Sequence, residues 1–180
     1  MSTDAKRLSP TSYVVLGLIG LRGPSTPYDL KQAVGHSVGH FWPFPHSQLY
    51  QEPDRLVGEG LLAVAQEQTG RRRKTYSLTE AGRRAVRQWL KEPAGEAFQV
   101  RNIAELKLFF SELGDDEDVV ALAEEQIALH EKRLAEFEAI DERFAGRTDL
   151  GKRLIPLRLG RRLEEAALEF WREFVPDEQS

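Results

Sequence analysis

The stretch QTGRRRKTYSLTEAGRR, residues 68–84, sets four cations side by side: Arg71, Arg72, Arg73 and Lys74. The segments on either side, residues 61–68 and 74–79, are predicted to form two β-strands because apolar, β-branched and aromatic residues recur in them. Thr79 is a suitable N-cap for a helix over residues 80–92, which Pro93 would end. The stretch therefore predicts a β-hairpin with a cationic tip, followed directly by a helix.

Three helical segments precede this hairpin. Residues 11–21 are apolar almost all round, as in a helix buried in a small core, although their glycines and valines leave a strand possible. Thr26 and Pro27 are typical of a helix start, and that helix is expected to end near Gly35. Residues 46–58 form the third helix, whose inward positions are Leu49 or Tyr50, Pro53, Leu56 and Val57. The order of elements is that of a winged helix-turn-helix, so the expected fold class is mainly α with a small β-hairpin.

The composition fits a protein of the cytoplasm. The 180 residues include no cysteine, which excludes disulfides and thiolate chemistry. The N-terminus is polar, unlike a signal peptide, and the longest nearly apolar run, residues 13–21, is too short to cross a bilayer. Residues 1–93 hold 13 Lys and Arg against 8 Asp and Glu, whereas residues 94–180 hold 12 against 21. The basic first half is therefore the part expected to meet a polyanion.

The hairpin and the helix before it together predict a surface for duplex DNA. Cations at the hairpin tip would contact phosphates or enter the minor groove, releasing condensed counterions. The preceding helix would lie in the major groove, where Gln48 and Gln51 can pair with an adenine edge and Arg55 can reach guanine or phosphate. Tyr50 and Tyr76 could donate a hydrogen bond to phosphate or equally belong to the core. The candidate DNA-binding residues are Ser47, Gln48, Tyr50, Gln51, Arg55, Arg71, Arg72, Arg73, Lys74 and Tyr76.

Other interpretations of these segments remain open. A run of cations by itself is typical of a solvated turn, and a winged helix can also serve as a protein-docking module without DNA. An enzyme is disfavoured because a GxSxG nucleophile elbow, a P-loop, an HExxH motif and a cysteine nucleophile are all expected to be absent. The histidines at 36, 40 and 46 surround Phe41 and Trp42, but the nearby glycines and prolines disfavour a zinc site. We expect a connecting loop there, whose aromatic residues cover the small core.

Residues 94–180 are predicted to be helical. Ile103, Leu106, Phe110 and Leu113 share one face of a short helix, and the carboxylates of residues 115–118 favour the start of a long one. Apolar residues then recur at the alternating spacing of a helix–helix interface, and a last amphipathic helix follows. One small domain would leave part of these stripes uncovered, so we expect a homodimer formed through residues 115–175. The candidate dimerisation residues are Val120, Ile127, Leu134, Phe137, Leu159, Leu163, Phe170 and Phe174.

Aromatic residues from both halves could line a pocket for a small effector. The candidates are Trp89, Phe109, Phe110 and Trp171, although aromatic residues at helical spacing more often form a core or a dimer interface. His130 lies in the apolar stripe of the long helix. It is expected to be a partly buried interface residue, with a pH switch as a further option.

Residues 12–92 resemble the winged-helix domain of the PadR family of bacterial transcriptional regulators. The matching segments are SYVVLGLIGLRGPSTPYDLKQAV (12–34), SQLYQEPDRLVGEGLL (47–62) and, most specific, RRRKTYSLTEAGRRAVRQWL (71–90). Residues 94–180 resemble the longer C-terminal region of the Vir-like members in length and helical pattern. Members commonly have Tyr-Pro-x-Leu in the recognition helix, where this chain has YQEP at 50–53. Either that helix kinks at Pro53 or its regular part begins there.

The resemblance implies a homodimeric regulator, usually a repressor. Residues 1–10 would be a flexible N-terminus, residues 11–93 the DNA-binding domain, and residues 94–180 the helical dimerisation and effector domain. The expected partners are double-stranded DNA with a two-fold operator, a second copy of the chain and a small, often aromatic, molecule. In relatives, such a molecule or another signal releases the DNA. No metal or other cofactor is expected.

Overall fold

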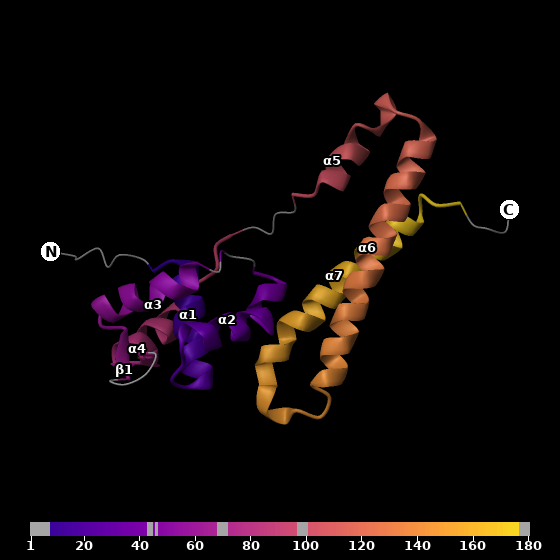
Figure 1. The fold of residues 1–180 in the computed structure, drawn as a ribbon. Helices are drawn as coiled ribbons and strands as arrows, with labels where there is room; N and C mark the ends of the chain where they lie inside the picture. Colours follow the sequence, from indigo (N-terminus) through magenta and orange to yellow (C-terminus); the bar gives the residue numbers. More distant parts are fainter. Residues whose placement is uncertain (1–7, 43–44, 46, 68–71, 97–100, 177–180) are drawn as a thin grey trace. The chain divides into compact units, whose positions relative to one another are not determined.

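The computed structural model describes residues 8–42, 45, 47–67, 72–96 and 101–176 (Figure 1). The chain divides into two compact units, Met1–Glu96 and Ala97–Ser180, each with its own hydrophobic cluster. The first unit contains α1 (Pro10–Arg22), α2 (Pro27–Gly35), η1 (Val38–His40), α3 (Gln48–Gly58), β1 (Leu62–Gln66), β2 (Lys74–Leu78) and α4 (Glu80–Trp89). The second contains α5 (Ile103–Phe109), η2 (Ser111–Leu113), α6 (Asp116–Arg143), η3 (Thr148–Leu154) and α7 (Ile155–Arg172). The predicted fold class, mainly helical with one small hairpin, is confirmed.

Helix α1 begins one residue earlier than the sequence predicted. Ser9 is its N-cap, with a side chain that accepts from the Ser12 amide at 3.1 Å, and Pro10 is the first helical residue. The Ser12 hydroxyl in turn accepts from the Ser9 amide at 3.1 Å, which completes a capping box. Ser9 and Pro10, which the sequence analysis placed in the N-terminal segment, therefore belong to the start of α1.

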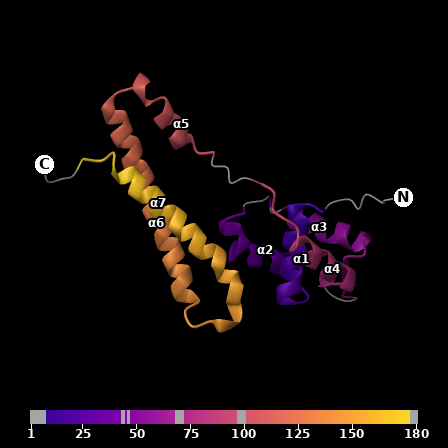
Figure 2. The same cartoon turned by 180° about the vertical axis from the view of Figure 1, so that it is seen from behind.

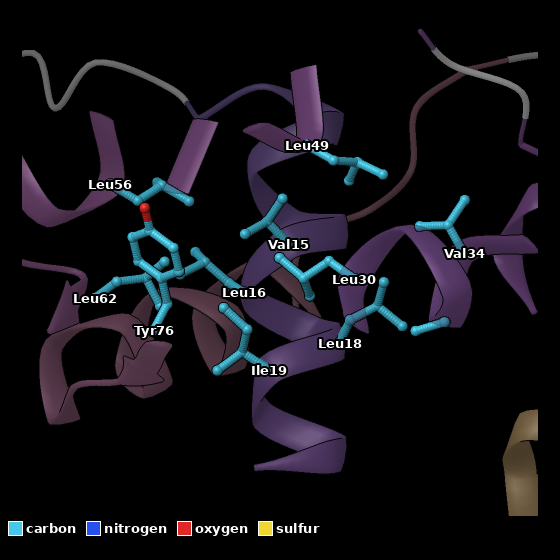
Figure 3. Packing of buried hydrophobic residues seen from close by; sticks show 11 residues of the cluster. Val15, Leu16, Leu18, Ile19, Leu30, Val34, Leu49, Leu56, Leu62 and Tyr76 are labelled. Carbon is cyan, nitrogen blue, oxygen red and sulfur yellow. The ribbon is translucent and has the colours of Figure 1, made fainter. Parts of the chain in front are cut away.

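The core of the first unit is built around α1. Val15, Leu16 and Ile19 are buried, so this nearly apolar segment is the central helix and not a strand. Side chains from α2, α3, β1 and β2 surround it. Figure 3 shows the Tyr76 ring beside Leu16, Leu56 and Leu62, where helix and hairpin residues meet. No helix within the described part of the chain has the length and apolarity needed to span a bilayer.

The hairpin has the predicted strands and gains a partner that the sequence did not reveal. Strands β1 and β2 are antiparallel, with Leu62 opposite Leu78 and Gln66 opposite Lys74. On the other side of β2, Ser25 and Tyr76 exchange two backbone hydrogen bonds of 2.9 Å each. The segment between α1 and α2 therefore adds a single-residue third strand, which fixes the hairpin to the helices.

Helix α3 continues through Pro53. It begins at Gln48 and ends at Gly58, so the alternative in which its regular part starts at Pro53 is wrong. Pro53 has no N–H to donate to the Leu49 carbonyl, but its ring is fully buried in the core. Burial of Leu49, Pro53 and Leu56 on one face offsets the lost hydrogen bond, and Gln48 lies on the helix itself.

Helix α4 is capped on the hairpin and packs very closely against it. The Thr79 hydroxyl donates to the Leu61 carbonyl at 2.9 Å and accepts from the Gly82 amide at 3.0 Å. A Cβ atom at Gly82 would lie 2.2 Å from the Leu61 carbonyl oxygen. The helix ends at Trp89, three residues before the predicted end. Pro93 follows four residues later and disfavours a helical conformation in the residue before it.

The second unit is a helical hairpin with a short helix beside it. Helices α6 and α7 pack side by side, as both Figure 1 and Figure 2 show. The Phe137 ring lies on the α7 backbone, because a Cβ atom at Gly160 would be only 2.9 Å from its Cζ atom. Ala123 and Trp171 are buried with Ala104 of α5 in one cluster. Polar contacts also connect the two long helices, including a 2.9 Å bond from Arg172 to Glu131.

This packing corrects part of the predicted dimer interface. Phe137 is buried within the chain itself, and Ile127 and Phe174 pack on the cluster around Trp171. Val120 and Leu134 are half-buried. The spacing of the apolar stripe of α6 suits packing against α7 of the same chain as well as against a second copy. Spacing alone therefore could not show that Phe137 packs within the chain. By contrast, Leu159, Leu163 and Phe170 of α7 remain exposed, as does Ile155 one turn before them.

Gly82→Ala is expected to destabilise the first unit by about 1–3 kcal/mol, because the new methyl group would push α4 away from the Leu61 carbonyl. Thermal or urea unfolding followed by circular dichroism measures this. Gly17→Ala is the matched control, since nothing lies within 4 Å of a Cβ atom at Gly17. In the middle of α1 this change should stabilise by roughly 0.5–1 kcal/mol. Equal effects of the two substitutions would contradict the close packing at Gly82.

Candidate nucleic-acid interface

Helix α3 has one buried face and one exposed polar face. Leu49, Pro53 and Leu56 point into the core, at helical spacing. The exposed side chains are those of Ser47, Gln48, Tyr50, Gln51 and Asp54. Tyr50, left open by the sequence between core and surface, is 50% exposed. The Gln48 side-chain carbonyl accepts from the Thr11 hydroxyl of α1 at 2.8 Å, which orients its amide.

The cationic tip of the hairpin is the wing of the fold. Of its four predicted cations, Arg72, Arg73 and Lys74 are exposed, whereas Arg71 lies outside the described residues. Arg72 has φ +48°, a left-handed conformation that is uncommon for a residue with a side chain. The Arg73 carbonyl accepts from the Glu67 amide at 3.1 Å and continues the strand pairing into the tip. The tip therefore presents arginines from a constrained backbone.

Asp54 connects α3 to the wing. Its carboxylate oxygens accept from the Lys74 ammonium at 2.9 and 2.7 Å, and one of them also accepts from the Tyr76 hydroxyl at 2.8 Å. The hydrogen bonds from Lys74 and then Tyr76 lower the pKa of Asp54, so this carboxylate is ionised at neutral pH. The recognition helix and the wing are thus adjacent and bonded to each other.

Tyr76 is part of the core and not a phosphate contact. It is 1% exposed, and its hydroxyl is already bonded to Asp54. Burial, with the Asp54 hydrogen bond as a second cause, raises the pKa of Tyr76, which therefore stays neutral. Its prediction as a DNA-binding residue is wrong because strand β2 turns this side chain inward. The alternation of Tyr76 and Leu78 with the polar Thr75 and Ser77 is the sequence signal that could have placed Tyr76 on the buried face.

Arg55 is bonded within the protein rather than presented to a ligand. Its guanidinium donates to Glu52 at 2.5 and 2.9 Å and to the Ser12 hydroxyl at 2.9 Å, and it also pairs with Glu59. The Ser12 hydroxyl donates to Glu52 at 2.6 Å, so the cluster ties α1 to α3. These partners remove Arg55 from the set of candidate base contacts. The sequence analysis missed Glu52 and Ser12, although Glu52 and Arg55 have the i,i+3 spacing of a helical ion pair.

The predicted effector residues lie in different surroundings. Trp89 is stacked on Tyr13 of α1, with ring centroids 4.4 Å apart. Trp171 is 3% exposed and belongs to the core of the second unit, which leaves little of its surface for an effector. Phe109 and Phe110 are exposed, and their rings meet edge to face. Phe110 also lines a groove of about 630 Å³ between α5 and α6, together with Leu106, Leu122 and Asp118 among others.

The histidine-rich connection gives no support for a metal site. His46 lies outside the described residues, and no group of three metal-ligating side chains occurs in the part of the chain that the structure describes. Phe41 and Trp42 are 56% and 43% exposed, which contradicts their predicted role in covering the core. In the second unit His130 is partly buried, as predicted, and its Nδ1 atom lies 2.6 Å from a Glu164 carboxylate oxygen of the same chain.

Contrary to the expectation that the chain lacks it, the G-x-S-x-G pattern of a hydrolase nucleophile elbow is present in the segment GHSVG, residues 35–39. An elbow requires a strand before the serine and a helix after it. Here Ser37 follows the end of α2, and a single 3-10 turn comes next. The Ser37 hydroxyl donates to the Ala33 carbonyl at 2.6 Å, as a helix C-terminus commonly allows. The pattern therefore does not form an elbow.

Comparison with known proteins identifies both units. Residues 15–88 match the family described as "Transcriptional regulator PadR-like family", and residues 100–175 match the region described as "Virulence activator alpha C-term". The chain is 30% identical over 166 residues to the probable transcriptional regulator Rv1176c of Mycobacterium tuberculosis, a match that covers 81% of this chain and 86% of that protein. It is 27% identical over 135 residues to the negative transcriptional regulator PadR of Bacillus subtilis, with 73% and 72% covered.

Solved structures show the same fold. Bacillus subtilis PadR in complex with operator DNA has a TM-score of 0.81 at 23% identity, with 92% of this chain and 96% of that chain covered. The same regulator in complex with p-coumaric acid has a TM-score of 0.77 at 24% identity, with 90% and 94% covered.

A winged helix joined to a helical unit of the virulence-activator type defines the class, and the protein is a transcriptional regulator. It belongs to the PadR-like family. The predicted family, including the Vir-like C-terminal region, is confirmed.

Glu52→Gln is expected to destabilise the first unit by about 1–2 kcal/mol at pH 7, because hydrogen bonds to an ionised group are removed at a largely buried site. The Arg55 hydrogen bond, followed by that of Ser12, lowers the pKa of Glu52 below 4.5, its ordinary value. The ionised form therefore stabilises the folded state above pH 4.5, and this contribution disappears as the pH falls through the lowered pKa.

The difference in unfolding free energy between wild type and Glu52→Gln should accordingly shrink below pH 4.5. Urea unfolding at a series of pH values measures it. Glu80→Gln is the control, because that exposed carboxylate lies 3.8 Å from Arg83 and should contribute little. A difference that stays constant down to about pH 2.5 would contradict the role of the ionised Glu52.

Proposed function

We propose that this regulator is a homodimeric repressor that binds a two-fold DNA operator and is released by a small aromatic molecule. The observation that carries the proposal is the bond between Asp54 of α3 and Lys74 of the wing, which joins the exposed polar face of α3 to the hairpin that carries the arginines. The relative named as a negative regulator and its structures with operator DNA and with p-coumaric acid support the same function.

Each exposed side chain has a role in this proposal. Helix α3 lies in the major groove, where Gln48 and Gln51 contact base edges and Ser47 and Tyr50 contact the sugar-phosphate backbone. The wing lies over the neighbouring phosphates or in the minor groove, with Arg72 and Arg73 described here and Arg71 beside them in sequence. Residues 11–93 are then the DNA-binding domain. The protein acts in the cytoplasm, and binding, not catalysis, is its whole function.

Dimerisation is assigned to residues 94–180. Ile155, Leu159, Leu163 and Phe170 form an exposed apolar stripe along α7, at spacings of four, four and seven residues. An apolar stripe of this kind on a soluble protein is commonly covered by a partner. A second copy would place two wings on one duplex, which matches a two-fold operator. Trp89, Phe109 and Phe110 remain the candidate contacts for the effector, since all three are exposed.

The main alternative is a winged helix that docks on another protein without binding DNA. A docking module gains nothing from clustered arginines at the wing tip, whereas a DNA-binding protein does. Titration with genomic DNA fragments, beginning with the protein's own promoter, separates the two. Lack of binding at low salt would favour the docking module.

Replacing Arg72 and Arg73 together by alanine should weaken binding to all DNA sequences alike. The slope of log K against log salt concentration should flatten by roughly 0.9 for each phosphate that the variant no longer neutralises. Replacing Gln48 or Gln51 by alanine should instead change the sequence preference and leave the slope nearly unchanged. Fluorescence anisotropy with specific and random duplexes at several salt concentrations measures both. If the arginine and glutamine variants behaved alike, the division of roles would be wrong.

Replacing Leu159 and Leu163 together by glutamate should convert the dimer into a monomer, because two carboxylates would be buried in an apolar interface. Light scattering should then report the 20.5 kDa mass of one chain, against twice that mass for the wild type. Lys152→Glu, a new carboxylate just before α7, is the control and should remain dimeric. A monomeric wild type at micromolar concentration would overturn the proposed dimer.

A further inference from the structure

The exposed face of α3 carries an anion where a polyanion is proposed to bind. Asp54 is 49% exposed at its side chain, on the same helix face as Gln51. Phosphates repel a nearby carboxylate, so this residue should weaken DNA binding. Its place on this face therefore calls for a separate role. Its bonds to the wing point to such a role.

Asp54 pairs with one of the wing cations and neutralises its charge. Both of its oxygens accept from the Lys74 ammonium, at 2.9 and 2.7 Å, so this cation is locally neutralised. The carboxylate is itself held in place by the Tyr76 hydroxyl at 2.8 Å, and Tyr76 is fixed by the core and by its backbone pairing with Ser25. Asp54 therefore cannot follow Lys74 outward without breaking a bond to a buried residue.

We propose that Asp54 is a specificity-determining residue of the DNA-binding surface: it withholds Lys74 from the DNA phosphates and bonds the wing to the recognition helix. The inference rests on the DNA binding proposed above and deepens it. Its direct consequence is that the wing acts through its arginines, although four cations stand in a row in the sequence.

Two physical arguments support this assignment. A cation on phosphate strengthens binding to every sequence equally, so removing one lowers non-specific affinity without touching the base-reading side chains of α3. In addition, transfer of Lys74 to a phosphate would leave the Asp54 carboxylate unpaired beside a second anion. The transfer therefore has a cost on the protein side, because the hydrogen bonds between Lys74 and Asp54 would be lost.

The test compares salt dependence in four proteins: wild type, Asp54→Asn, Lys74→Ala and the double variant. Asp54→Asn frees Lys74, so the slope of log K against log salt should steepen by roughly 0.9 and affinity for random duplex should rise up to tenfold at about 0.1 M salt. The ratio of specific to random affinity should fall. Lys74→Ala alone leaves the Asp54 carboxylate without its cation beside the phosphates, so it should weaken binding. In the Asp54→Asn background it should cancel the whole gain and return the slope to the wild-type value.

Glu80→Gln provides the matched control. It removes one negative charge from the same unit and breaks a carboxylate–cation pair with Arg83, away from the wing. It should change the slope much less than Asp54→Asn does, which separates a local release of Lys74 from a general increase in positive charge. Circular dichroism establishes that each variant is folded.

The outcomes are distinct. If the double variant has a slope flatter than that of the wild type by roughly 0.9, Lys74 already binds phosphate and the inference is wrong. An unchanged slope in folded Asp54→Asn overturns it as well. Should Asp54→Asn fail to fold, Asp54→Ser replaces it in both the single and the double variant. A wild type that binds no DNA would instead overturn the proposed function.

Discussion

The placement of Tyr76 is the constraint on which the DNA-facing surface depends. Its ring is buried between α1, α3 and the hairpin, its backbone pairs with Ser25, and its hydroxyl is bonded to Asp54 of α3 (Figure 3). One side chain thereby connects the core, the third strand and the recognition helix. The wing is a two-stranded hairpin, which is marginally stable alone, so its orientation relative to α3 comes from these interactions.

Most of the fold could be predicted because local signals and hydrophobic periodicity agree. Thr26 and Thr79 cap helices where the sequence places them, and both strands follow the predicted hairpin. The missed features depend on long-range geometry or on local detail that the pattern does not carry. Ser25 joins the sheet only because α1 and α2 bring it beside β2. The helix across Pro53 survives because tertiary burial outweighs a local penalty.

The candidate site was less predictable, because residue type does not say whether a polar group is already paired. Arg55 and Lys74 both look available in sequence, yet each is bonded to a carboxylate of α3. The apolar stripe of α6 presented a similar difficulty, because residue type does not say which helix covers it. Its spacing requires a helical partner but does not specify which, and α7 of the same chain provides it at Phe137. The type of a residue, its burial and its bonding partner are separate properties, and sequence patterns report the residue type best.

These ion pairs refine the interpretation of the unequal charge of the two halves of the chain. Residues 1–93 carry a net positive charge, but part of it is compensated within the unit, by Asp54 at the wing and by Glu52 and Glu59 at Arg55. The field that a duplex meets is therefore set less by the number of cations than by which of them lack a carboxylate partner. A protein that must discriminate among many competing sites benefits from such compensation, because surplus positive charge strengthens the wrong complexes as much as the right one.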